Sequence, residues 1–189
     1  MAIIKECHQK DINLTSDKIK AALFEYFRFK KGLFCVSEAK LAYKDIDDFL
    51  GFKIGNSHIY NTHCVEVKIS KSDFLADFSS KEKHKNHAIN YNYFYFCVSA
   101  DLIDFASEYL KQNYPNYGLL SINESGQIYS ILKAKFNKGG FIATNKILSS
   151  IVARMSSELA SAKIKLIKLR ITNDKFDICD YRLMCLYGN

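Results

Sequence analysis

The chain has 189 residues, of which 48% are hydrophobic and 25% charged, and its formal net charge is +7. This length and composition fit one globular domain, residues 1–189, and exclude a disordered chain. No apolar run approaches the roughly 18 residues of a transmembrane helix, and the N-terminus lacks the order of a signal peptide. We therefore expect a cytoplasmic protein with no membrane partner. The positive charge favours a polyanionic partner, of which nucleic acid is the commonest.

The cysteine pattern argues against a zinc site or a disulfide framework. None of the six cysteines belongs to a C-x-x-C pair, and three of them lie inside apolar strand patterns. Zinc sites and disulfide frameworks need tighter spacing or a secreted context. We expect reduced and mostly buried thiols that behave as small hydrophobic residues.

The first elements in chain order are a helix and three strands. Ile19, Leu23 and Phe27 recur at helical spacing after the candidate caps Thr15 and Ser16, and the residues that follow alternate as strands do. Gly55-Asn56-Ser57 has the chemistry of a hairpin turn between the second and third strands. The expected helix spans residues 16–29, and the expected strands span 33–41, 48–53 and 59–70.

The second half predicts further helices and strands. Ser72 is the expected cap of a short helix, and the all-apolar run 93–98 is typical of a strand that is covered on both faces. A long amphipathic helix is expected near the C-terminus, and the alternation after it suggests either strands or peripheral structure. The expected helices are 101–112 and 141–162, the expected strands are 119–122 and 128–132, and the ambiguous segments are 164–171 and 180–186.

The segment from Cys64 to Ser70 is the most informative part of the chain. Apolar residues alternate there with Glu66, Lys68 and Ser70, so that the acid and the lysine share one face of a strand. Charged residues seldom lie in a buried strand unless they are paired or bind something. Asp48 opens the preceding strand. Two neighbouring strands that each present a carboxylate, with a lysine two residues after the second, predict a site for a divalent metal and a phosphodiester.

The order helix, three strands, helix, strand is that of the restriction-endonuclease-like core. Ser37-Glu38, then Asp48, then the stretch Glu66–Phe74 resemble the PD-(D/E)xK nuclease superfamily, and within it the MmcB-type DNA-repair family with its phage and mobile-element relatives. The resemblance covers residues 15–136 and leaves 137–189 as a C-terminal helix plus extension. It implies an α/β fold with a mixed central sheet flanked by helices.

The resemblance also implies a function: a Mg²⁺- or Mn²⁺-dependent deoxyribonuclease that hydrolyses DNA phosphodiester bonds in repair or in phage or mobile-element DNA processing. The chain departs from the family pattern in two ways. Asp47 replaces the usual small residue before Asp48, and the basic pair upstream of it is absent. The missing basic pair bears on how the protein would hold its substrate.

Metal-dependent hydrolysis of a phosphodiester requires the same residue types. Magnesium prefers oxygen ligands and keeps several waters, so the carboxylates of Asp48 and Glu66 with the Val67 carbonyl suffice as a ligand set. The metal activates a water and polarises the phosphate. Lys68 would orient that water or balance the developing charge. Glu38 could bind a second metal or hold a water.

A basic segment follows the Glu-x-Lys strand. Its functional interpretation is contact with DNA phosphates, while a solvated helix face would explain the same charges without function. A metal site built from His58, His63, His84 and His87 is also conceivable, although their spacing specifies nothing. The expected nucleic-acid contacts are Ser70, Lys81, Lys83, His84, Lys85 and His87.

Three questions about individual residues stay open from the sequence. On an exposed edge, Glu66 and Lys68 would be a surface pair worth under about 1 kcal/mol. Strand parity does not choose between Asp47 and Asp48, and we take Asp48 from the family pattern. Tyr91, Tyr93 and Tyr95 either offer stacking surfaces or pack in the core.

At the level of function, the nuclease competes with a non-catalytic nucleic-acid-binding module and with a phage-related interaction protein that keeps the fold. Intact acids and lysine favour the enzyme over both. A homodimer is expected by analogy with other nucleases of this fold, although no interface is legible in the sequence.

Overall fold

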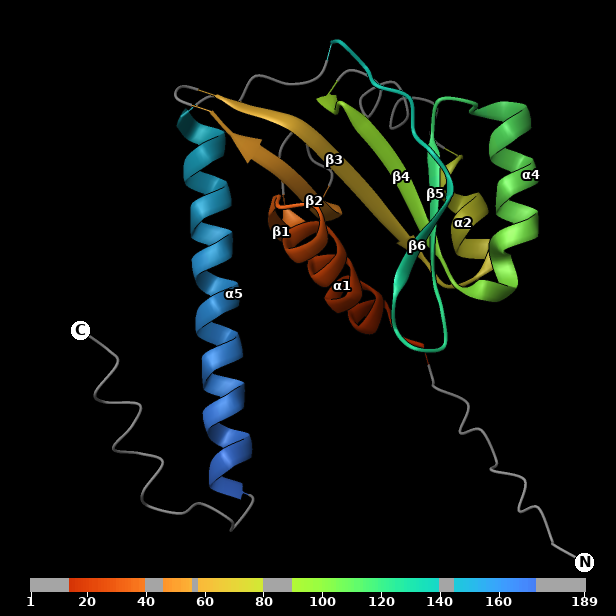
Figure 1. Cartoon of the computed structure of the whole chain (residues 1–189). Coiled ribbons are helices and arrows are strands. Elements are labelled where there is room, and N and C mark those ends of the chain that lie inside the picture. Colours follow the sequence, from red (N-terminus) through yellow and green to blue (C-terminus); the bar gives the residue numbers. More distant parts are fainter. Residues whose placement is uncertain (1–13, 40–45, 56–57, 80–89, 140–144, 173–189) are drawn as a thin grey trace, which may run out of the picture.

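A six-stranded mixed sheet forms the centre of the protein. The computed structural model describes residues 14–39, 46–55, 58–79, 90–139 and 145–172. The strands lie in the sheet in the order in which they occur in the sequence (Figure 1). This architecture is the expected α/β fold and is compatible with a restriction-endonuclease-like core. The strands are β1 (Phe34–Ala39), β2 (Asp47–Ile54), β3 (Ile59–Lys68), β4 (Tyr93–Val98), β5 (Gly118–Ile122) and β6 (Ile128–Leu132).

The strand directions change in the middle of the sheet. β1, β2 and β3 pair antiparallel, β3–β4 and β4–β5 pair parallel, and β6 returns antiparallel to β5. A parallel pair cannot be joined by a tight turn and needs a crossover connection, usually a helix. The helix α2 (Lys71–Asp77) lies in the first crossover, and the short 3₁₀ helix η2 (Ala100–Leu102) with α4 (Ile103–Asn113) lies in the second.

Helices cover both faces of the sheet and bury two separate cores. On one face, Phe74 of α2 and Leu110 of α4 pack against Leu50 and Phe96 of the sheet. On the other face lies α1 (Ser16–Phe24), which a π-helical segment η1 (Glu25–Lys30) continues. Figure 1 shows α1 against one side of the strands and α2 and α4 against the other. β3 and β4 are buried from both sides, as the apolar run at 93–98 predicts.

The beginning of α2 corrects one prediction. Ser70, not Ser72, is the N-cap residue, because its Oγ accepts a hydrogen bond from the backbone N of Asp73 at 3.2 Å. Ser72 lies within the helix, and its Oγ is 3.1 Å from that of Ser70. The third strand accordingly ends at Lys68, two residues before the predicted end.

The C-terminal helix α5 (Asn145–Thr172) is longer than predicted. Of the two alternatives left open for 164–171, the strand is wrong, because these residues are helical. Residues 145–172 contain no glycine or proline to end the helix, and β1 at the nearby sheet edge already pairs with β2. The second ambiguous segment, 180–186, lies outside the described residues. None of the described helices, α5 included, is long and apolar enough to cross a membrane.

The cysteine prediction is confirmed where it can be examined. Cys35, Cys64 and Cys97 are free and buried. Burial raises the pKa of the Cys35 thiol to about 12, in spite of the opposing charge of Arg28. These thiols therefore pack as small apolar groups. The other three cysteines lie outside the described residues.

Candidate active site

Glu66 and Lys68 lie on the same face of the central strand β3 and are deeply buried. Their relative exposures are 3% and 7%. β3 is paired on both sides, with β2 and with β4, so neither residue lies on an edge. The interpretation as an exposed surface pair is therefore wrong. Burying two charges is costly unless they have partners, so the groups around this pair determine whether its burial is stable.

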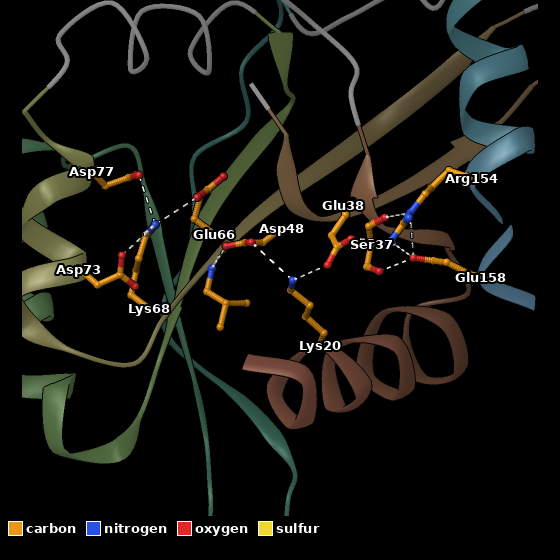
Figure 2. Close-up of polar contacts among 11 residues, drawn as sticks. Lys20, Ser37, Glu38, Asp48, Glu66, Lys68, Asp73, Asp77, Arg154 and Glu158 are labelled. Atoms are coloured by element: carbon orange, nitrogen blue, oxygen red, sulfur yellow. Dashed lines mark hydrogen bonds and ion pairs between the residues drawn. The ribbon is translucent and has the colours of Figure 1, made fainter. Parts of the chain in front are cut away.

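The Lys68 ammonium is surrounded by carboxylates. Its Nζ lies 3.3 Å from Glu66 Oε2 and 3.2 Å from Asp77 Oδ1, and Asp73 Oδ1 is 4.0 Å away (Figure 2). Asp73 and Asp77 are one turn apart on α2, which the Ser70 cap begins. Among the described residues, three carboxylates lie around this one lysine, so negative charge is in excess in this part of the site. Such an excess favours binding of a further cation.

Asp48 connects β2 to the same point of β3. Its Oδ2 accepts a hydrogen bond of 2.9 Å from the backbone N of Val67, the residue between Glu66 and Lys68. Its Oδ1 lies 3.7 Å from Lys20 Nζ of α1, and its side chain is 29% exposed. Figure 2 shows the Asp48 carboxylate between Glu66 and Lys20. A carboxylate in this place is both positioned by the strand and accessible from outside.

Asp47 and Asp48 point in different directions, but regular strand alternation does not account for the face on which each side chain lies. Asp47 pairs with Ala39 of β1, and Ala39 packs in the same core as Val36, three residues earlier. Regular alternation would place residues three apart on opposite faces. Glu38, between them, has a φ of 50°, in the left-handed region, where the strand deviates from regular geometry. This irregularity directs Asp47 toward the core that contains Cys64.

Asp47 belongs to a buried hydrogen-bonded cluster. Potential ligand atoms of Asp47, Cys64 and Glu66 all lie within 4.8 Å of one another. Cys64 Sγ donates to Asp47 Oδ1 at 3.5 Å, and the Tyr91 hydroxyl donates to Asp47 Oδ2. Burial, followed by the charges of Asp47 and Glu66, raises the pKa of the Cys64 thiol well above its usual value. A metal ion bound here would displace the thiol proton, so the cluster either positions Asp47 through its hydrogen bonds or is a second set of ligand atoms that shares Glu66.

Glu38 joins the site through α1 and α5. Its Oε1 lies 3.3 Å from Lys20 Nζ, and its Oε2 lies 2.7 Å from a guanidinium nitrogen of Arg154. Next to it, the Ser37 hydroxyl donates to Glu158, which is one turn beyond Arg154 on α5. The Ser-Glu pair of the predicted motif is therefore held by the C-terminal helix. Because Lys20 contacts both Glu38 and Asp48, these two predicted acids share one cation.

The donor atoms present suit a hard divalent ion. Asp48 and Glu66 would hold Mg²⁺ or Mn²⁺ through carboxylate oxygens, with the Val67 carbonyl as the predicted third ligand. Asp48 meets the requirement for access better than Asp47, because its side chain is 29% exposed whereas Asp47 is 2% exposed and lies in the interior. The assignment of Asp48, Glu66, Val67, Lys68 and Glu38 to metal binding and catalysis stays a prediction.

The predicted DNA contacts fall largely outside the described residues. Ser70 is described, and its hydroxyl caps α2. Lys81, Lys83, His84, Lys85 and His87 lie outside the described residues. Of the two described histidines in the histidine-based metal set, neither His58 nor His63 belongs to a metal-ligand cluster of the described structure.

Sequence reasoning missed four charged residues around the site. Asp77 carried a signal, because it follows Asp73 by one helical turn after the Glu-x-Lys strand. Lys20 lies one residue after the predicted core position Ile19, and nothing in the sequence links it to Asp48. Arg154 and Glu158 are more than a hundred residues from Glu38 in sequence, so only the fold brings them together.

Comparisons with known proteins show the fold and no function. No protein-family model matches the chain, and no curated protein matches it. Among solved structures, the chain is similar to SPO1766, a protein of unknown function from Silicibacter pomeroyi, with a TM-score of 0.53 and 17% identity. The match covers 88% of this chain and 99% of that chain. At this identity the likeness supports the shared fold alone.

Proposed function

We propose that the protein is a Mg²⁺- or Mn²⁺-dependent deoxyribonuclease of the PD-(D/E)xK type. The observation that carries the proposal is the buried Glu66–Lys68 pair on the central strand, with Asp48 hydrogen-bonded to the residue between them. A fold without catalysis would gain stability from apolar residues at these places, since buried ion pairs seldom stabilise more than well-packed apolar residues do. Retaining three charges there is easier to explain by chemistry.

The residues would divide the work as follows. A divalent ion held by Asp48, Glu66 and the Val67 carbonyl supplies a Lewis acid and lowers the pKa of a bound water. Lys68, held by Glu66 and Asp77, keeps its ammonium at a fixed position, where it orients the attacking water or balances charge on the phosphate. Lys20 balances Glu38 and Asp48 when the metal is absent.

The substrate side of the proposal rests on charge. The formal net charge of +7 favours a polyanion, and the segment from Lys81 to His87 is the expected contact with the DNA backbone. We place the enzyme in the cytoplasm and in DNA repair or in phage or mobile-element DNA processing. The pathway follows from the family resemblance, and the reduced cysteines are consistent with the cytoplasm.

A cleavage assay tests the proposal. Labelled single-stranded, duplex and branched DNA would be incubated with the wild type, Asp48→Asn, Glu66→Gln and Lys68→Met in Mg²⁺ or Mn²⁺. Glu108→Gln, on the exposed side of α4, is the matched control. We expect metal-dependent cleavage that falls about 100-fold or more in the three site variants and not in the control. Equal cleavage by wild type and Glu66→Gln would overturn the proposal.

A non-catalytic nucleic-acid-binding module is the second candidate. It is favoured by the ion pairs of the site, in which Lys20 and Arg154 hold Glu38 while Lys20 also contacts Asp48. Charges balanced in this way are consistent with a site that no longer needs a metal. DNA binding without cleavage, equal in the wild type and Glu66→Gln, would support this candidate. Absence of both cleavage and DNA binding would favour a phage-related interaction protein.

A further inference from the structure

A second hollow lies on the α1 face of the sheet, away from the candidate active site. Its volume is about 400 Å³, and it lies between the end of η1 and strands β2 to β6. His63 of β3 lies at its base, three residues before Glu66 and on the opposite face of the strand, which places the hollow about 10 Å along β3 from the acid. Neither the metal site nor its proposed chemistry uses these residues.

The charges that line this hollow have one sign. Lys31, Lys53 and Lys133 contribute to its wall, and no aspartate or glutamate of the described residues does. In the part of the chain that the structure describes, no salt bridge involves these three lysines. Burial and then the charges of Lys31 and Lys53 lower the pKa of His63 to about 4, in agreement with their place in the lining around it. Within the described ranges, these positive charges face no carboxylate in the hollow.

Parallel aromatic rings form the floor beside the lysines. The His63 and Tyr93 rings are 4.5 Å apart and 18° from parallel, and the Tyr95 ring, on the same strand as Tyr93, lies 6.1 Å from His63 and 11° from parallel to it. Gly118 of β5 makes room for this arrangement, because a Cβ at that position would lie 2.3 Å from the Tyr95 ring. Tyr93 and Tyr95 are half-buried, so they face the hollow, whereas Tyr91 is buried in the opposite core.

One polar atom at the base also lacks a partner. His63 Nδ1 is buried and makes no hydrogen bond to any described residue. A buried imidazole nitrogen without a partner costs free energy, and a ligand that provides a hydrogen-bonding group would recover it. Lysines without acids, stacked rings and an unsatisfied imidazole together match the two parts of a nucleotide, an anionic phosphate and a flat base.

We propose that this hollow binds a nucleotide unit, with its phosphate among Lys31, Lys53 and Lys133 and its base against the His63–Tyr93–Tyr95 rings. The unit is either a free mononucleotide or one nucleotide of a single-stranded nucleic acid. This site is separate from the proposed nuclease centre and does not depend on it. Its role would be to recognise a ligand or to hold a strand at a distance from the metal.

Calorimetric titration of the full chain tests the proposal. The probes are 5′-AMP, adenosine, inorganic phosphate and a 5′-phosphorylated hexathymidylate, each without divalent metal so that the nuclease site does not contribute. We expect saturable binding of 5′-AMP or of the oligonucleotide. A stronger signal from 5′-AMP assigns a free nucleotide, and a stronger signal from the oligonucleotide assigns a single strand.

The variants separate the phosphate from the base. Lys53→Gln combined with Lys133→Gln should weaken both nucleotide and phosphate binding at least tenfold, because these exposed lysines supply the charge. Tyr93→Leu should weaken nucleotide binding while phosphate binding stays, because only the base needs the ring. Lys111→Gln on α4 is the control lysine. Circular dichroism checks that each variant folds. Failure of every probe to bind, or equal binding by the double lysine variant, would overturn the proposal.

Discussion

Lys68 is the residue on which the electrostatics of the site depend. It is 7% exposed and is the cation next to two buried carboxylates, Glu66 and Asp77. The interior attraction between opposite charges is strong, but it has to compensate for the water that all three groups lose. Removing Lys68 is therefore expected to be worse than removing either acid, because both buried acids lose the ion pair that they share with it.

We expect Lys68→Met to lower the free energy of unfolding by about 3–5 kcal/mol at neutral pH. Asp73→Asn is the matched control, since Asp73 is half-exposed and 4.0 Å from Lys68, so its loss should change stability by less than about 1 kcal/mol. Urea unfolding followed by circular dichroism measures both. Equal costs for the two variants would show that Lys68 does not hold the site together.

At the level of single residues, the sequence predicted part of the site. The alternation of Cys64–Ser70 correctly placed Glu66 and Lys68 on one buried face, because β3 is regular there. Asp47 and Asp48 could not be assigned by parity, because apolar residues follow on both faces of β2. The irregular backbone at Glu38 is a further deviation with no signal in the sequence. Lys20 and Arg154 reach the site only through tertiary packing of α1 and α5.

Among the secondary-structure elements, α2 is the helix whose acidic residues contact Lys68. Ser70 at its N-cap fixes where the helix begins, and therefore which residues turn toward β3. Asp73 N donates to the Ser70 hydroxyl, while Asp77 lies one turn further and is buried against Lys68. The cap and the ion pair are thus parts of one short segment that follows the strand of Glu66.

Ser70→Ala should lower the free energy of unfolding by about 1 kcal/mol, because it removes the hydrogen bond to the first turn of α2. Ser72→Ala, the cap that the sequence favoured, should cost clearly less, since Ser72 lies inside the helix and loses only its contact with Ser70. Thermal or urea unfolding of the two variants decides the point. A larger effect at Ser72 would place the cap where the sequence first suggested it.

The strands were more predictable than the last helix. Period-two alternation and the apolar run at 93–98 gave every strand of the sheet to within about two residues at most ends, because burial imposes those patterns directly. The C-terminal half of α5 was not predicted, because Ile164, Leu166 and Ile167 are exposed and no core imposes a helical pattern on them. The apolar residues in this half of α5 follow a spacing that differs from that of a helix packed on a core.

At the level of the whole molecule, packing against the central sheet does not explain the length of α5. It packs on β1 near its beginning, and Figure 1 shows its later turns extending past the sheet. Apolar or small residues recur along it with alternating steps of four and three, the repeat of a coiled-coil seam. The residues of this stripe are Leu148, Val152, Met155, Leu159, Ala162, Leu166 and Leu169.

Most of this stripe is exposed in the single chain, with Leu159 at 58% and Leu169 at 62%. A second copy of the chain presents the same seam, so we expect a homodimer through α5. Sedimentation velocity should show a dimer that Leu159→Glu with Leu166→Glu converts to a monomer. Ile164→Glu, equally exposed but outside the stripe, should leave the dimer intact. A monomer at all concentrations would contradict this expectation.

The most direct test of the account is a Mn²⁺ titration of the protein followed by electron paramagnetic resonance of the free ion. We predict one saturable site in the wild type that Glu66→Gln and Asp48→Asn both remove. Asp47→Asn should keep it, because the Asp47 oxygens are occupied by Cys64 and Tyr91. The absence of a saturable site in the wild type, or its loss in Asp47→Asn and survival in Asp48→Asn, would contradict the proposed metal centre.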